Sequence, residues 1–141
     1  MKAHLQSIAV MAALIPAQAM AGFVDNYAKW KEMPQQSQLV YLAGAVDALL
    51  QIATKGEPKD DTARREGILT CFDRQAFDAG RALELVNNHY KEFPVDGQYG
   101  PAPVLFYGIV QMCLPQINEE RAKLGLSALI RLPDQLSADN P

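Results

Sequence analysis

Apolar residues recur at helical spacing along most of this chain of 141 residues, and this periodicity constrains the fold more than any other feature. In residues 35–54, leucine, valine and alanine side chains stand at i, i+3, i+4 and i+7, the pattern of one buried helix face. Pro34 can occupy the first turn of this helix, and Gly56 followed by Pro58 can end it. No segment alternates between apolar and polar residues at period two, so the sequence predicts an all-α fold.

Five further segments carry helix signals of the same kind. Asp78 and Asn118 stand where they can cap two of these helices, and Asp60 or Asp61 can cap a third. The predicted ranges are 24–31, 61–69, 79–92, 102–112 and 118–130. The length fits one domain. We therefore expect a compact bundle of four to six helices over residues 22–131, followed by a frayed, flexible tail at residues 132–141.

The first 21 residues have the layout of a cleavable secretory signal peptide. Lys2 supplies the positive charge, residues 8–15 form a short apolar stretch, and Ala19-Met20-Ala21 offers a small-x-small cleavage site, with Ala17-Gln18-Ala19 as a second. A membrane anchor, the alternative, would need about 20 predominantly apolar residues. We therefore expect an exported, soluble protein that begins at Gly22 and has no membrane anchor.

Cys71 and Cys113 are the only cysteines, and both follow the predicted cleavage site. In an oxidising compartment an isolated pair favours a disulfide, which here is worth on the order of 4 kcal/mol. The alternatives are a metal pair or a catalytic thiol. A metal site would need more ligands, yet His89 is the only histidine of the exported part and no Cys-x-x-Cys occurs. We predict a structural disulfide.

Composition and motifs argue against several functions. A net charge of −3 argues against a nucleic-acid partner, which would need a basic face. The chain has neither a glycine-rich phosphate loop nor a serine-hydrolase elbow. His89 has no free cysteine or serine motif as a partner, so we expect it at the surface or boundary of a helix. We predict a protein that is not an enzyme, with no cofactor and no metal site.

Three residues stand out within the predicted helices. Asp47 interrupts an apolar stretch, where it either faces solvent or is a partly buried carboxylate that binds a neighbouring helix end or a tyrosine. Gly44 and Gly108 each weaken a helix by up to about 1 kcal/mol relative to alanine. Close approach of two helix backbones would explain both glycines.

Four stretches occur in an order and spacing that resemble one family. Tyr41, Gly44 and Asp47 are followed by Cys71, and two further stretches then span 84–94 and 102–113. Over residues 39–113 the chain resembles the Rap/Tai immunity proteins of type VI secretion. The resemblance implies a helical, exported and often dimeric protein that neutralises peptidoglycan-cleaving amidase effectors in the periplasm. It also implies an amidase as the protein partner and a possible homodimer.

An inhibitor of such an amidase needs a rigid protrusion that fills the enzyme's cleft. The loop 94–101 is a candidate because it joins two predicted helices and is bounded by prolines. Tyr99 offers an anchor, Asp96 and Gln98 offer polar contacts, and Gly97 lies between them. The alternative is an ordinary turn that needs glycine and proline for its backbone angles. The loop 55–62, rich in charge, is the second candidate for the interface.

Two other functions remain open. A periplasmic chaperone or envelope-stress protein could expose apolar surface when its acidic residues, sixteen in all, are protonated. A purely structural partner in envelope assembly is the third class.

Overall fold

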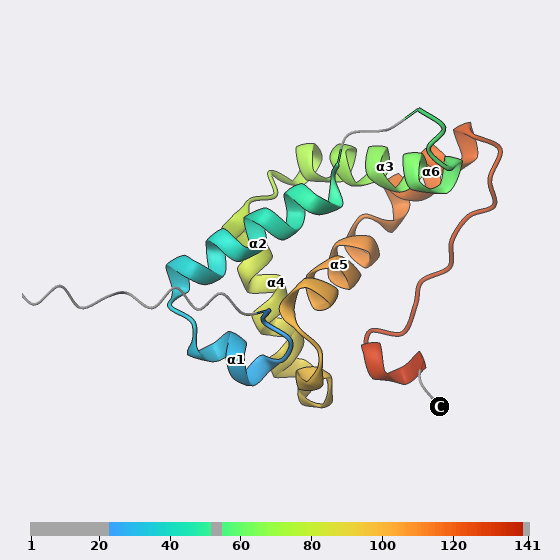
Figure 1. Ribbon diagram of the computed structural model, residues 1–141. Coiled ribbons are helices and arrows are strands. Elements are labelled where there is room, and N and C mark those ends of the chain that lie inside the picture. Colours follow the sequence, from blue (N-terminus) through green and yellow to red (C-terminus); the bar gives the residue numbers. More distant parts are fainter. Residues whose placement is uncertain (1–22, 52–54, 140–141) are drawn as a thin grey trace, which may run out of the picture.

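The computed structural model describes residues 23–51 and 55–139, and this part of the chain is all-helical, with no strand. The predicted signal peptide, residues 1–21, lies outside it. These residues form six α-helices and two 3₁₀ helices, and Figure 1 shows their arrangement. Their bounds are α1 Tyr27–Glu32, α2 Gln35–Leu49, α3 Lys59–Gln75, α4 Ala79–Glu92, η1 Pro94–Gln98, α5 Pro101–Met112, α6 Leu114–Lys123 and η2 Leu136–Asp139.

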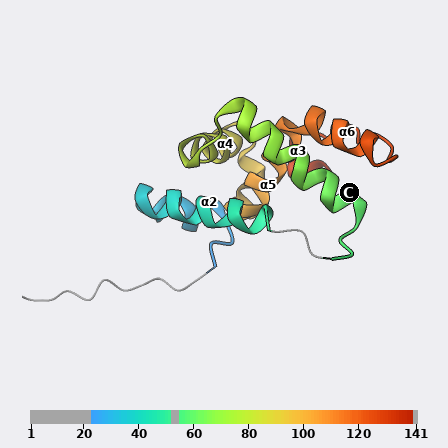
Figure 2. The same cartoon turned by 90° about the horizontal axis from the view of Figure 1, so that it is seen from above.

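The helices pack as two groups that share one core. Helices α3 and α6 lie against each other, while α2, α4 and α5 pack together, as the view from above shows (Figure 2). Burial of apolar side chains from all six α-helices drives this packing. The largest buried core side chains are Trp30, Leu42, Ile68, Val86, Val104, Leu105, Ile109 and Ile117.

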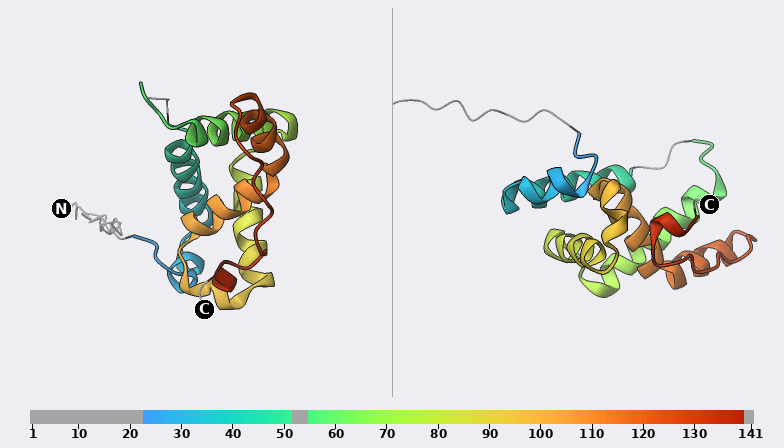
Figure 3. Two further views of the ribbon diagram at one scale, coloured as in Figure 1. Left: turned by 90° about the vertical axis from the view of Figure 1, so that its right-hand side faces the viewer. Right: turned by 90° about the horizontal axis from the view of Figure 1, so that it is seen from below.

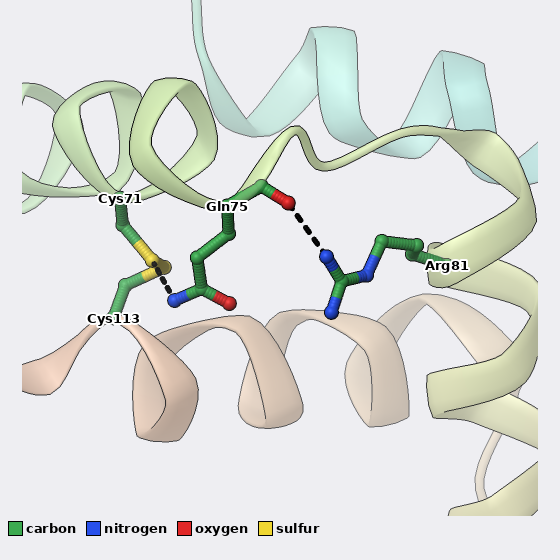
Figure 4. Close-up of a disulfide and its surroundings, with 4 residues drawn as sticks. All are labelled: Cys71, Gln75, Arg81 and Cys113. Carbon is green, nitrogen blue, oxygen red and sulfur yellow. Dashed lines mark hydrogen bonds between the residues drawn. A yellow bond between two sulfur atoms is a disulfide. The ribbon is translucent and has the colours of Figure 1, made fainter.

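The predicted disulfide between Cys71 and Cys113 is confirmed, and it joins α3 to the junction of α5 and α6. Figure 4 shows its surroundings: the Gln75 side-chain amide donates to Cys71 Sγ at 3.3 Å, and Arg81 Nη1 donates to the Gln75 carbonyl at 2.6 Å. The bridge and these bonds together tie the α3–α4 turn to the end of α5.

The start of α4 agrees with the prediction from its capping residue, whereas the start of α6 does not. Asp78 caps α4 by accepting from the Arg81 N–H at 2.8 Å, as predicted. The prediction for 118–130 was wrong, because α6 begins directly after Cys113 and Asn118 stands inside it. The left-handed Gly125 (φ 73°) then ends the helix.

Other helix boundaries also differ. Helix α3 is longer than the predicted 61–69, so Cys71 lies inside it, and no side chain caps it in the way expected of Asp60 or Asp61. Helix α1 begins at Tyr27, where Asn26 caps it by accepting from the Lys29 N–H at 3.0 Å.

Close contacts between helices involve one of the two predicted glycines, Gly108, and also Gly67, which was not predicted. A Cβ on Gly44 would meet nothing within 4 Å, so the expectation of a close approach there was wrong. At Gly108 a Cβ would overlap with the Leu85 side chain of α4. At Gly67 it would overlap with the backbone of Ile117, so Gly67 is the residue that lets α3 and α6 touch.

A frayed tail was expected at residues 132–141, but the described part of it, residues 132–139, includes the short helix η2 and packs against η1. Residues 126–139, which we name the C-terminal strap, leave α6 and return past α5 to place η2 beside η1 (red in Figures 1 and 3). Asn118 holds the strap midway, accepting from the Leu129 N–H at 2.7 Å and donating to the Leu129 carbonyl at 3.0 Å. Within the described part of the chain, no helix has the length and apolar character needed to cross a membrane.

Candidate partner-binding surface

The predicted protrusion is a short 3₁₀ helix, η1, packed against the start of the described chain. A Cβ on Gly100 would overlap with the Val24 carbonyl oxygen, so glycine is what lets residues 23–27 lie alongside this loop. Gly97 also faces Tyr27, but a Cβ there would stand 3.5 Å from Tyr27 Cβ, an ordinary contact that does not require glycine. We name this part of the molecule, residues 23–27 and 94–99, the η1 end.

Asp96 is an internal anchor and not the surface contact that we predicted. Its side chain is fully buried and accepts from the backbone N–H groups of Leu136 at 2.9 Å and Ser137 at 3.1 Å. His89 Nε2 lies 2.8 Å from Asp96 Oδ2. Burial alone raises the pKa of Asp96, but the bonds from Leu136, His89 and Ser137 outweigh it, and the pKa lies below its ordinary value. Asp96 therefore holds η1, α4 and the strap together as a carboxylate.

The other loop residues differ in exposure. Tyr99 is half-buried against the core, and its carbonyl accepts from the Tyr90 hydroxyl at 2.8 Å. Burial raises the pKa of Tyr90, so this hydroxyl keeps its proton. Gln98 is exposed and Gly97 is half-buried. Of the four predicted contact residues, Gln98 thus offers the most accessible side chain.

Sequence reasoning missed the exposed apolar residues of the η1 end. Phe23 is 95 % exposed, Val95 is 55 % exposed and Tyr27 is 38 % exposed. Figures 1 and 3 place the segments that carry them at the same end of the molecule. The signal available in the sequence was Val95, an apolar residue inside a loop bounded by prolines. Large apolar side chains gathered at one end of a rigid fold are typical of a protein-binding surface.

The residues of the predicted motif do not join this surface. Asp47 and Gly44 are exposed on α2. Of the two alternatives for Asp47, a residue that faces solvent or a partly buried carboxylate, the structure therefore has the first. Tyr41 is half-buried, its ring 5.9 Å from that of Trp30 in an edge-on arrangement, and burial raises its pKa. The Trp30 Nε1–H in turn donates to Asn87 Oδ1 at 2.9 Å. Trp30 therefore joins α1 to α2 through Tyr41 and to α4 through Asn87.

The second candidate loop, 55–62, uses its charges within its own chain. Arg65 Nη1 lies 2.5 Å from the Glu57 carboxylate, and this bond, together with one from Thr62, lowers the pKa of Glu57. Asp60 forms an ion pair with Arg121 of α6. These contacts fix the loop against α3 and α6 and leave fewer charges for a partner.

His89 is the one histidine of the described residues and lies beside the η1 end, with its side chain 9 % exposed. Residues 23–51 and 55–139 contain no group of three or more histidine, cysteine or acidic side chains arranged to hold a metal ion. Comparison with protein-family models, curated proteins and solved structures gives no match to this chain.

Proposed function

We propose that the exported protein is a periplasmic immunity protein, without catalytic activity of its own, that binds a peptidoglycan-cleaving amidase effector of type VI secretion and occludes its active-site cleft. The resemblance over residues 39–113 supports the class of partner. The observation that carries the proposal is the exposure of Phe23 and Val95 at an end of the molecule that is fixed from within by Asp96.

Rigidity of the η1 end matters because association costs free energy for every group that must be ordered. The buried Asp96 carboxylate already orders η1 against the strap, and Gly100 seats the first described residues against the same loop. An aromatic side chain such as Phe23 or Tyr27 is the type that most often anchors a protein interface. Val95 and Gln98 would supply apolar and polar contacts beside it.

An acid-activated chaperone is less well supported. Such a protein would have to release apolar surface in mild acid, and the strap is the segment whose release would do so. The pKa of its anchor, Asp96, lies below the ordinary value, so the carboxylate keeps its bonds to Leu136 and Ser137 in mild acid. A homodimer remains a prediction of the resemblance alone.

Co-expression tests the location and the partner together. Each amidase encoded beside this gene is sent to the periplasm with the full-length protein or with a version that lacks residues 1–21. We expect the full-length protein to prevent lysis and the version retained in the cytoplasm to fail. Protection by the cytoplasmic version would contradict the periplasmic role, and lysis with both versions for every amidase would contradict the immunity role.

A further inference from the structure

A second site lies on the side of the molecule that the strap crosses. A cavity of about 450 Å³ opens between α4, α5 and the strap. Its apolar lining includes Leu85 and Met112, and Gly108 leaves room for the Leu85 side chain, since a Cβ there would overlap with it. Neither the predicted loops nor the η1 end uses this cavity.

Three rings gather in this cavity. The His89 ring centroid lies 5.1 Å from that of Phe93 and 6.4 Å from that of Tyr107, and all three residues line the cavity. Aromatic faces attract an organic cation through the ring quadrupole when the cation lies within about 6 Å of the centroid. A cluster of rings is therefore suited to an ammonium or a guanidinium group.

The polar groups of the cavity point to the same chemistry. The exposed Glu92 carboxylate also lines the cavity and forms no ion pair within the described part of the chain. The unpaired Glu92 carboxylate is an acceptor that a cation in the cavity can reach.

The charged residues that line the cavity leave an excess of negative charge there. On the strap, Arg131 lies 2.8 Å from Asp134 and is neutralised by it. His89 is bound to Asp96, which balances the ring if it is charged. Glu92 is then the one lining charge without a counterion among the described residues. Charge complementarity therefore favours a cation.

We propose that this cavity binds an organic cation, namely a primary ammonium or guanidinium group on an alkyl stem. The cation lies against the rings and pairs with Glu92, and the stem follows Leu85 and Met112. A free diamine or a lysine or arginine side chain of another protein would supply this chemistry. No residue of the η1 end lines the cavity, so the site does not depend on the amidase proposal.

Titration followed by ¹H–¹⁵N NMR tests the site on the purified protein. The probes are 1,5-diaminopentane, the peptide acetyl-Ala-Lys-Ala-amide, and 1-pentanol as the neutral analogue. We expect both cations to shift the amide signals of residues 89–93 and 107–111, with a Kd of about 1 mM or below, and the alcohol to bind at least about tenfold more weakly. The tighter of the two cations identifies the source, a free amine or a protein side chain.

Two variants of α4 provide the matched comparison. Glu92→Gln keeps the shape of the side chain and removes its charge, so the affinity for both cations should fall at least about fivefold. Glu84→Gln removes an exposed charge of the same helix outside the cavity and should leave the affinity unchanged. Equal binding of 1-pentanol, an unchanged affinity in Glu92→Gln, or no cation-induced shift at about 10 mM would each overturn the proposal.

Discussion

The Asp96 carboxylate accepts a hydrogen bond of 2.9 Å from the backbone N–H of Leu136, a residue 40 positions later in the chain. Asp96 is fully buried, so its carboxylate oxygens are closed off from water, while this bond and the one from Ser137 are partly buried. Buried charge-assisted bonds of this kind are among the stronger polar contacts in a protein. These two hydrogen bonds therefore couple the conformation of η1 to the position of the strap.

Asp96→Asn should lower the free energy of unfolding by about 3 kcal/mol, because the amide cannot replace a carboxylate that accepts from three groups. Urea unfolding at pH 7 measures this change. Asp47→Asn, an exposed change of the same chemistry on α2, should alter stability by less than about 0.5 kcal/mol. Equal effects of the two substitutions would mean that the anchor contributes nothing specific.

The contribution of Asp96 should depend on pH in a defined direction. The pKa of Asp96 is lowered in the folded protein, so its stabilisation is complete above the ordinary value of about 3.9 and is lost as the pH falls through the folded pKa. The difference in unfolding free energy between the wild type and Asp96→Asn should stay constant from pH 7 to about pH 5 and shrink below about pH 4. Urea unfolding at four or five pH values checks this, and a difference already lost at pH 5 would contradict the anchor.

The disulfide should carry a large part of the stability. Replacing Cys71 by serine removes the link between α3 and the α5–α6 junction and should cost about 2–5 kcal/mol. Thermal unfolding of Cys71→Ser against the oxidised wild type measures the loss. Alkylation of the native protein without reductant, followed by intact mass, should add no label. Labelling of both cysteines under those conditions would show that the native protein does not contain the bridge.

Two glycines within helices should respond in opposite ways to alanine. Gly67→Ala should destabilise the protein by about 2–4 kcal/mol, because the methyl group would overlap with the Ile117 backbone and push α3 away from α6. Gly44→Ala meets nothing within 4 Å and should stabilise α2 by up to about 1 kcal/mol. Differential scanning calorimetry of the two variants compares them. A neutral Gly67→Ala would refute the tight α3–α6 contact.

Local signals were enough to predict the elements whose ends are set locally. Helix α4 has the predicted bounds because Asp78 caps its start and Pro94 follows its end. The disulfide followed from the isolated pair of cysteines. The bounds of α6 did not follow, because Asn118 reads equally well as a cap and as the partner of a distant backbone, which it is here for Leu129.

The candidate surface was harder to predict because its parts are distant in the sequence. Asp96 reads as an exposed loop acid until residues 136 and 137 are brought beside it. Phe23 is the second residue after the predicted signal peptide, and nothing in the local pattern places it near Val95. Gly67 lies within a predicted helix as Gly44 does, and only the packing of Ile117 against it separates the two.

An inhibition assay tests the central proposal most directly. Purified amidase effectors digest peptidoglycan in the presence of the wild type, of Val95→Asp at the η1 end, or of Val40→Asp, which changes another exposed valine, on α2. We predict that the wild type and Val40→Asp inhibit one of these amidases at a stoichiometric ratio. Val95→Asp should require at least about a tenfold higher concentration, a loss of about 1.4 kcal/mol or more. Full activity of every amidase in the presence of excess wild-type protein would contradict the immunity function, and equal inhibition by both variants would exclude the η1 end as the interface.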